Sequence, residues 1–352
     1  MHQSTVYFKN IVKEYTAGVR AVDNISCTFE PGTLTTLLGP SGCGKTTSLR
    51  LIAGLERATS GNIFIDDEDV TLLPATDRDV TMVFQSYALF PHMSVLENVS
   101  YGLKMAGIKK EESHEKSIKT LELIGLENFE SRMPSELSGG QQQRVAVARA
   151  IVLEPKVLLF DEPLSNLDAK LRRQVREDIR GIQQKLGVTT IYVTHDQEEA
   201  LAISDKVIVM NEAIIAQEGS PKNLYHNPET KFVANFIGDS NIVKARIETK
   251  DDSQYKISFA NIIHEVKSKL DLSNEISIAI RPEKIKLKET KIENSLEGKI
   301  INSSFVGNTY QYSLETDLGK LYAISSDTKN FKSNNDNIFV SFEEDAITLL
   351  LD

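Results

Sequence analysis

A chain of 352 residues is longer than one hydrophobic core usually organises, so we expect two domains. Its net charge of −10 argues against nucleic acid as the main partner and against direct adsorption to anionic lipid, because no basic stripe is available to neutralise phosphates. The two cysteines lack metal or redox spacing, the N-terminus lacks a signal-peptide pattern and no apolar run approaches the roughly 20 residues that span a bilayer, which predicts reduced thiols in a cytosolic protein.

Two short strands are predicted at the start of the chain, over residues 6–15 and 21–29. Tyr15 lies shortly before the next predicted strand, where an aromatic ring could stack on an adenine base. Taken by itself, Tyr15 is interpreted more simply as a half-buried tyrosine of a strand.

The glycine-rich segment after the apolar run 33–38 predicts a phosphate-binding loop. Its residues are Gly39, Pro40, Ser41, Gly42, Cys43, Gly44, Lys45, Thr46 and Thr47. The backbone amides of such a loop, and the positive end of a helix beginning at Lys45, can hold the charges of a phosphate chain. We expect Lys45 to reach the β and γ oxygens of a nucleotide and the Thr46 hydroxyl to ligate Mg²⁺. A chance glycine-rich turn is the alternative, which the flanking strand and helix disfavour.

Strands and helices alternate over the following part of the chain. Strands are predicted at 61–66, 79–84, 157–160, 189–194 and 207–210, and helices over most of 94–155 and over 168–186. This alternation over the first 237 residues predicts an α/β fold with a doubly wound parallel sheet, a RecA-like P-loop core. The helical part, about residues 86–155, is expected to be an insertion into that core.

The composition changes after Gly238, where Asn, Ser, Lys and Asp become more frequent. Short alternating runs recur over 243–247, 255–259, 276–280, 296–305, 310–314, 321–324 and 338–342. Residues 238–352 are therefore predicted to form a small all-β barrel; a resemblance described below implies an OB-like arrangement for it.

Polar side chains at the ends of the predicted strands could act on a bound nucleotide. Asp161 and Glu162 follow an apolar run that has the pattern of a strand buried on both faces. We expect Asp161 to hold Mg²⁺ and Glu162 to polarise the attacking water; a solvated acidic turn is the alternative. Gln85 ends another strand and could reach both the metal and the water. His195 could contact the γ-phosphate, although a lone histidine is more often structural.

A second helix start that could bind phosphate lies at Ser138, Gly139, Gly140 and Gln141, with Ser138 as the capping residue. An ordinary capped helix is the alternative. The sequence LSGGQQQR, followed by VLLFDEP, resembles the ATP-binding-cassette (ABC) ATPases over residues 5–237. Tyr15, Gln85, Asp161, Glu162 and His195 match the functional positions of that family, as do the phosphate loop and the segment Ser165–Asp168. Asn166 stands where many relatives have alanine.

The resemblance implies a homodimer in which the Ser138 segment of each copy faces the phosphate loop of the other, with two ATP molecules and Mg²⁺ between them. The matching loop Ser165–Asp168 implies that Asp168 also takes part in binding the nucleotide. The segment Phe84–His92 resembles that of importer ATPases, in which a groove here receives a membrane permease. Each ATPase dimer would thus serve two permease subunits or domains, and indirectly a solute-binding protein, from the cytoplasmic face of the inner membrane.

The C-terminal segments Ile280–Glu283 and Val306–Thr309 are similar to the transport-associated OB (TOBE) domain of such importers. The combined pattern is most similar to ferric-iron importer ATPases, while polyamine, phosphonate, sulfate and sugar importers share most of it. Two other interpretations are an ABC protein of repair or translation, which usually carries paired cassettes, and a chain whose C-terminal domain mainly binds a regulator. A GTPase is disfavoured because no guanine-reading Asn-Lys-x-Asp motif is present.

Overall fold

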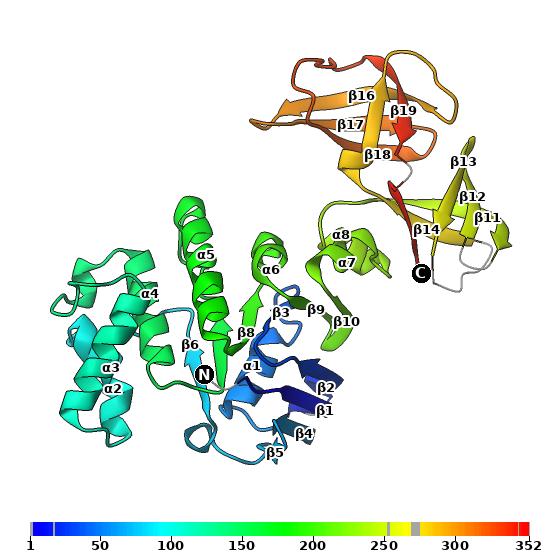
Figure 1. Cartoon of the computed structure of the whole chain (residues 1–352). Helices are drawn as coiled ribbons and strands as arrows, with labels where there is room; N and C mark the ends of the chain where they lie inside the picture. The colour runs from blue at the N-terminus through cyan, green and yellow to red at the C-terminus, as the bar shows by residue number, and fades with distance from the viewer. Residues whose placement is uncertain (1–2, 17, 252–253, 269–274, 344, 352) are drawn as a thin grey trace. The chain divides into compact units, whose positions relative to one another are not determined.

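The computed structural model describes residues 3–16, 18–251, 254–268, 275–343 and 345–351. The chain forms two compact units, Met1–Pro221 and Lys222–Asp352, shown in Figure 1. The sequence had suggested a boundary between residues 237 and 238, so the structure moves the segment 222–237 into the second unit. The reason is local packing, described below.

The first unit is built on a six-stranded sheet in the order β10-β9-β3-β8-β7-β6. Its strands are β10 (Ile214–Gly219), β9 (Lys206–Asn211), β3 (Leu34–Leu38), β8 (Thr189–Thr194), β7 (Val157–Asp161) and β6 (Val80–Val83). All neighbours are parallel except β9 and β10. Every residue of β3 and β8 is buried, as expected for strands covered on both faces. The predicted doubly wound parallel sheet is confirmed.

A second, antiparallel sheet lies against this core in the order β2-β1-β4-β5. Its strands are β1 (Val6–Thr16), β2 (Val19–Phe29), β4 (Ser60–Ile65) and β5 (Glu68–Asp69). One apolar cluster contains Phe8 and Ile63 of this sheet, Leu49 of helix α1 (Lys45–Ala53), and Val193 and Ile208 of the parallel sheet. Helix α1 is therefore packed from both sides. The sequence predicted three of these strands, but did not separate them from the parallel sheet.

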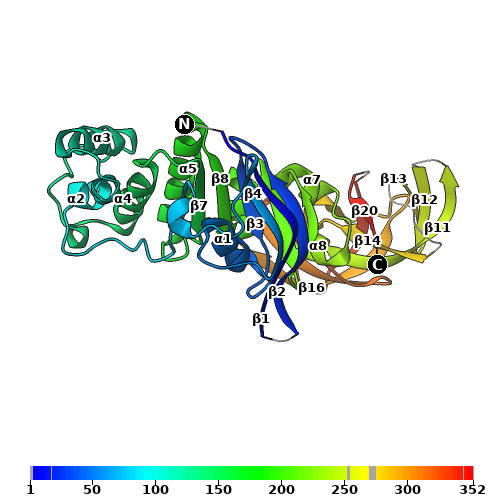
Figure 2. The ribbon, with the colours of Figure 1, turned by 90° about the horizontal axis from the view of Figure 1, so that it is seen from below.

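The predicted helical part consists of α2 (Val95–Met105), α3 (Lys110–Leu123) and α4 (Gly139–Ile151), which gather at one end of the first unit in Figures 1 and 2. Ser94 begins α2 with a capping box in which Glu97 is the reciprocal partner. Helices α5 (Ala169–Leu186) and α6 (Gln197–Ile203) follow strands β7 and β8. Short 3₁₀ turns lie at Ala75–Asp77 and Pro134–Glu136. No helix among the described residues combines the length and apolar character needed to cross a membrane.

The second unit consists of two five-stranded antiparallel sheets that share one apolar core. The first has the order β13-β12-β11-β14-β20, with β11 (Asn241–Asp251), β12 (Gln254–Phe259), β13 (Ile262–Lys267), β14 (Glu275–Ile280) and β20 (Ile347–Leu350). The second has the order β15-β19-β16-β17-β18, with β15 (Ile285–Lys288), β16 (Leu296–Phe305), β17 (Tyr310–Thr316), β18 (Gly319–Ser325) and β19 (Asn337–Phe342). The all-β prediction is confirmed; strands β13, β15 and β20 had been missed.

Two short helices, α7 (Pro221–His226) and α8 (Lys231–Phe236), join the second unit through Arg281. The Arg281 guanidinium donates to the carbonyl oxygens of Tyr225 at 2.6 Å and Ala234 at 3.1 Å and to Oγ of Ser240 at 2.8 Å. The Tyr225 hydroxyl donates to Glu283, in the 3₁₀ turn Pro282–Lys284, at 2.6 Å. Burial lowers the pKa of Arg281. These bonds explain why the segment 222–237 belongs to the second unit.

Candidate nucleotide-binding site

The loop between β3 and α1 has two positions, Gly39 and Gly44, where only glycine fits. Gly44 has a φ of +103°, and a Cβ there would lie 2.1 Å from the carbonyl oxygen of Ala21. A Cβ on Gly39 would lie 2.3 Å from the carbonyl oxygen of Met210. The loop is thus fitted closely against β2 and β9, and α1 begins at Lys45 as predicted. The positive end of α1 and the loop amides can bind an anion.

The Lys45 side chain is 5% exposed and folds back on the loop. Its Nζ donates to the carbonyl oxygens of Gly39 at 2.8 Å and Pro40 at 2.9 Å, and lies 3.8 Å from Sγ of Cys43. Burial raises the pKa of the Cys43 thiol, and the charge of Lys45 opposes that rise. The ammonium group has three hydrogens, so it can exchange these neutral acceptors for phosphate oxygens without a large movement of the backbone.

Thr46 and Asp161 meet at the end of the parallel sheet. Oγ1 of Thr46 donates to Oδ1 of Asp161 at 3.1 Å. Burial raises the pKa of Asp161, and the hydrogen bond from Thr46 and the charge of Arg50 oppose this. No cluster of three His, Cys, Asp or Glu side chains able to hold a metal exists among the described residues. A hydroxyl and one carboxylate fit Mg²⁺ that takes its remaining oxygen ligands from phosphates and water.

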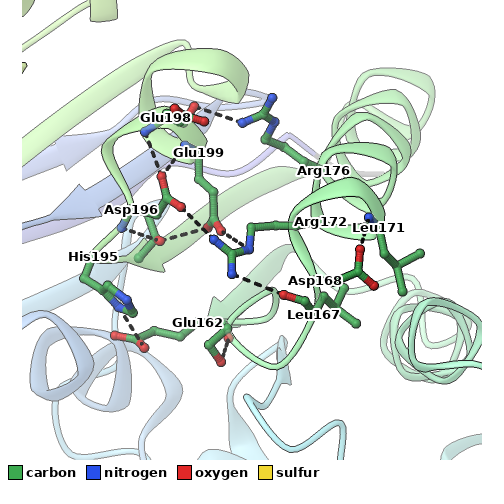
Figure 3. A network of polar contacts seen from close by, with 12 residues as sticks. Glu162, Leu167, Asp168, Leu171, Arg172, Arg176, His195, Asp196, Glu198 and Glu199 are labelled. Atoms are coloured by element: carbon green, nitrogen blue, oxygen red, sulfur yellow. Dashed lines mark hydrogen bonds and ion pairs between the residues drawn. The ribbon is translucent and has the colours of Figure 1, made fainter. Parts of the chain in front are cut away.

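Glu162 and His195 form a pair next to this point, shown in Figure 3. Nδ1 of His195 lies 3.1 Å from Oε2 of Glu162. Glu162 has a left-handed backbone, with φ of +44°, and its N–H donates to the carbonyl oxygen of Val193 in β8 at 3.0 Å. This places the carboxylate just beyond the end of the sheet, where it can accept a proton from, or orient, a water molecule.

Gln85 joins the same edge through the loop after Glu162. Its Nε2 donates to Oγ of Ser165 at 3.0 Å, and Nδ2 of Asn166 donates to its carbonyl oxygen at 3.0 Å. The Ser165 hydroxyl in turn donates to the carbonyl oxygen of Glu162 at 3.1 Å. The segments around Gln85, Glu162 and His195 are therefore connected, although they are far apart in sequence.

Three other predicted site elements have local contacts instead. Tyr15 is 52% exposed, and Nζ of Lys13 lies 4.7 Å from the centre of its ring. Ser138 caps α4 in a capping box with Gln141. Asp168 caps α5 by accepting from the N–H of Leu171 at 3.0 Å. In the part of the chain that the structure describes, no hydrogen bond joins these residues to Lys45 or Asp161.

The sequence did not predict a buried polar network behind His195. Glu199 is 3% exposed, and its carboxylate accepts from the hydroxyls of Tyr192 at 3.1 Å and Thr194 at 2.8 Å. Burial raises the pKa of Glu199, and the hydrogen bond from Thr194 opposes this. Arg172 approaches Asp196 and Glu199 from α5. Acidic residues one and four positions after His195, on a helix with buried Ala200 and Ile203, are the sequence signal that could have indicated it.

The glycine-dependent loop at the start of α1, with Thr46 bonded to an acidic strand end, defines a P-loop nucleotide-binding protein. Residues 22–165 match the ABC transporter family, and residues 278–350 match the TOBE domain. The chain belongs to the ABC transporter family as an ATP-binding subunit with a C-terminal TOBE domain.

Relatives with the same length support this assignment. The chain is 48% identical over 346 residues, covering 98% of both chains, to the "Fe(3+) ions import ATP-binding protein FbpC" of Agrobacterium fabrum. It is 49% identical, with the same coverage, to proteins of that name in Rhizobium meliloti and Brucella abortus.

Solved structures resemble the ATPase part of the chain. The structure of cbiO1 from Clostridium perfringens, part of the ABC transporter complex cbiONQ, has a TM-score of 0.59 and 29% identity, and covers 63% of this chain and 91% of its own. The ATP-binding cassette MJ0796, a dimer in a post-hydrolysis state bound to ADP and Pi, has a TM-score of 0.54 and 31% identity, and covers 61% of this chain and 98% of its own.

Proposed function

We propose that this chain is the ATP-hydrolysing subunit of an importer whose solute is ferric iron. The observation that carries the proposal is the 48–49% identity, along 98% of both chains, to proteins named for Fe(3+) import in several species. The nucleotide site described above supports the hydrolytic part independently of those names.

The residues of the site have different roles in ATP binding and hydrolysis. The loop amides and Lys45 bind the β- and γ-phosphates, and Tyr15 stacks on the adenine. Thr46, Asp161 and Gln85 would hold Mg²⁺, which neutralises charge that develops on the phosphates. Glu162 orients the attacking water and accepts its proton, while His195 holds the Glu162 carboxylate and faces the γ-phosphate.

A second copy of the chain completes each site. The Ser138–Gln141 segment makes its hydrogen bonds within α4, so its helix N-terminus is available to another molecule. In the closed dimer this segment, with the Asp168 loop beside it, contacts the γ-phosphate held by the other copy. Changing an open-to-closed ratio from 99:1 to 1:99 needs about 5.5 kcal/mol of differential binding, which several charge-assisted hydrogen bonds from two nucleotides can supply.

The segment Gln85–His92 transmits the change to a permease. The Arg149 guanidinium of α4 donates to the carbonyl oxygens of Tyr87 at 3.0 Å and Ala88 at 2.6 Å, both of which have left-handed backbones. Gln85 is thus linked at short range to the helical part of the unit. We propose that two permease subunits or domains dock there, which holds the chain peripherally at the cytoplasmic face of the membrane and connects it to a solute-binding protein.

Glu162→Gln tests the hydrolytic assignment. The variant should bind ATP and form a dimer, seen by light scattering, while hydrolysing it at least a hundred-fold more slowly than the wild type. Glu198→Gln is the matched control because Glu198 is exposed and its side chain is not used in the site. Hydrolysis by Glu162→Gln at the wild-type rate would remove Glu162 from the mechanism.

Uptake of radiolabelled ferric iron tests the solute. Cells lacking this gene should lose most of that uptake, and the wild-type gene should restore it while Glu162→Gln does not. Unchanged iron uptake together with lost uptake of a polyamine, phosphonate, sulfate or sugar would replace iron by that solute. ATPase activity that does not respond to any permease would instead indicate an ABC protein outside transport.

A further inference from the structure

Arg172 lies at the start of α5, donates hydrogen bonds to two acceptors and lies within ion-pair distance of a third, as Figure 3 shows. Its Nη2 donates to the carbonyl oxygen of Leu167 at 3.2 Å and its Nη1 to Oδ2 of Asp196 at 3.1 Å. Its Nε lies 3.9 Å from Oε1 of Glu199. One side chain therefore connects the loop that contains Ser165 and Asp168 with the turn that follows His195.

The residues on both sides of His195 belong to this network. Oγ1 of Thr194 donates to Glu199 at 2.8 Å and accepts from the N–H of Asp196 at 3.0 Å. Oδ1 of Asp196 accepts from the N–H groups of Glu198 and Glu199, which caps α6. The backbone of His195 is thus fixed from either side, whereas its imidazole is 57% exposed and contacts Glu162.

We infer that Arg172 is a positioning residue for ATP hydrolysis, which holds the His195 imidazole against the Glu162 carboxylate by anchoring the His195 turn to the 165–168 loop. The inference rests on the proposed ATPase function. A planar guanidinium can donate to Leu167 and Asp196 in different directions while its charge lies near Glu199, whereas a lysine ammonium on a flexible stem cannot reproduce that geometry. Because Gln85 bonds to Ser165 in the same loop, Arg172 also extends the Gln85 connection to His195.

A purely structural α5–α6 ion pair is the competing explanation, and it predicts lost stability without a specific effect on the chemical step. Arg172→Ala alone would leave the buried Glu199 carboxylate without its cation, which destabilises the fold. The double variant Arg172→Ala/Glu199→Gln removes that charge and keeps a side chain of the same shape. Arg173→Ala is the matched control, because the Arg173 side chain is 76% exposed and, in the described part of the chain, its ion-pair partner is Glu177 alone, on the helix surface.

The test measures ATP hydrolysis in these variants and in the same variants carrying His195→Ala. We expect Arg172→Ala to lower kcat at least ten-fold and to change KM for ATP less than two-fold. If Arg172→Ala does not fold, the double variant Arg172→Ala/Glu199→Gln takes its place, with the same expected result. Arg173→Ala should stay within two-fold of wild type. In the His195→Ala background, removal of Arg172 should change the residual single-turnover rate less than two-fold, because its effect passes through His195.

An equal loss of rate in both backgrounds, or a change confined to KM, would overturn the inference.

Histidine-labelled NMR gives a second readout: among six histidines, the His195 signal is the one lost in His195→Ala. It should shift or broaden in the Arg172 variants, as we also expect for Glu162→Gln, and an unchanged signal in the Arg172 variants would also overturn the inference. If the wild-type protein hydrolyses ATP and the Arg172 variant has a normal kcat, only the positioning role of Arg172 is refuted. Wild-type protein that hydrolyses no ATP, with or without permease, refutes the proposed function.

Discussion

Oγ1 of Thr46 donates a hydrogen bond to Oδ1 of Asp161, 115 positions later in the sequence. The sheet order β3-β8-β7 explains the contact, because only β8 lies between the strands that precede the two residues. The carboxyl ends of β3, β8 and β7 carry the phosphate loop, His195 and Asp161 with Glu162, respectively. Three parallel strands thus bring to one edge the groups that we propose bind a nucleotide and those that we propose act on it.

Lys45→Ala is expected to weaken ATP binding at least ten-fold. The loop keeps its backbone amides but loses the ammonium group that, among the described residues, lies against it. A fluorescent ATP analogue would measure Kd. Lys110→Ala, at an exposed position on α3, serves as the control and should bind normally. An unchanged Kd for Lys45→Ala would contradict the phosphate-loop assignment.

Gly44→Ala and Gly181→Ala should change stability in opposite directions. At Gly44 a Cβ meets the Ala21 carbonyl at 2.1 Å and the backbone is left-handed, so we expect a loss of about 2 kcal/mol or more. Gly181 lies within α5 with open space around it, so alanine should add about 0.5–1 kcal/mol through helix propensity. Urea unfolding of the two variants measures both changes; a destabilised Gly181→Ala would contradict the open environment.

Residues at the ends of helices were predictable because they act through short-range chemistry. The α1 start at Lys45, the capping residue Ser138 and the helix starts expected at residues 94 and 168 were all placed within one residue. Strand β15, with the sequence IKLK, was missed because it is short and every second residue is lysine. The pairing of β1, β2 and β4 into a separate antiparallel sheet depends on long-range packing around α1, which local patterns do not contain.

The positions of Glu162 and His195 beyond strand ends were predictable because each follows an apolar run, while their roles stay predictions. Arg172 was not, because α5 carries three other arginines and only the fold decides which one meets Asp196. Glu199 was missed for a related reason, since a glutamate near the start of a helix is usually solvated. The burial of Glu199 and the long-range contacts of Arg172, which no local pattern shows, give these residues their importance.

Cys27 should make the first unit less stable at alkaline pH. Burial, with a smaller contribution from the Glu218 charge, raises the pKa of this thiol to about 12. In the unfolded chain it ionises near roughly 8.5, so the stabilisation is complete below that pH and is lost as pH rises toward 12. Between pH 8 and 10.5 the wild type should lose up to about 2–3 kcal/mol more than Cys27→Ala. Urea titrations at both pH values measure this; equal losses would contradict the burial effect.

Arg281→Met should destabilise the second unit without affecting the first. The substitution leaves the carbonyl oxygens of Tyr225 and Ala234 without their buried donor, which costs about 2 kcal/mol or more. Calorimetry should show one transition moving to lower temperature while the ATP-stabilised transition stays in place. Arg246→Met, at an exposed position of β11, is the control. A shift of the ATP-stabilised transition by Arg281→Met would contradict the assignment of 222–237 to the second unit.

The hydroxyl of Ser138 accepts from the N–H of Gln141 at 3.4 Å, and this occupies a lone pair but not its hydrogen. The same atom can therefore begin its own helix and still offer a proton outward to an anion. Aspartate at this position would retain the first ability and forfeit the second, and it would present a negative charge to any approaching phosphate. The Ser138 hydroxyl oxygen can thus cap α4 through a lone pair while its hydrogen is available to an anion at the first turn.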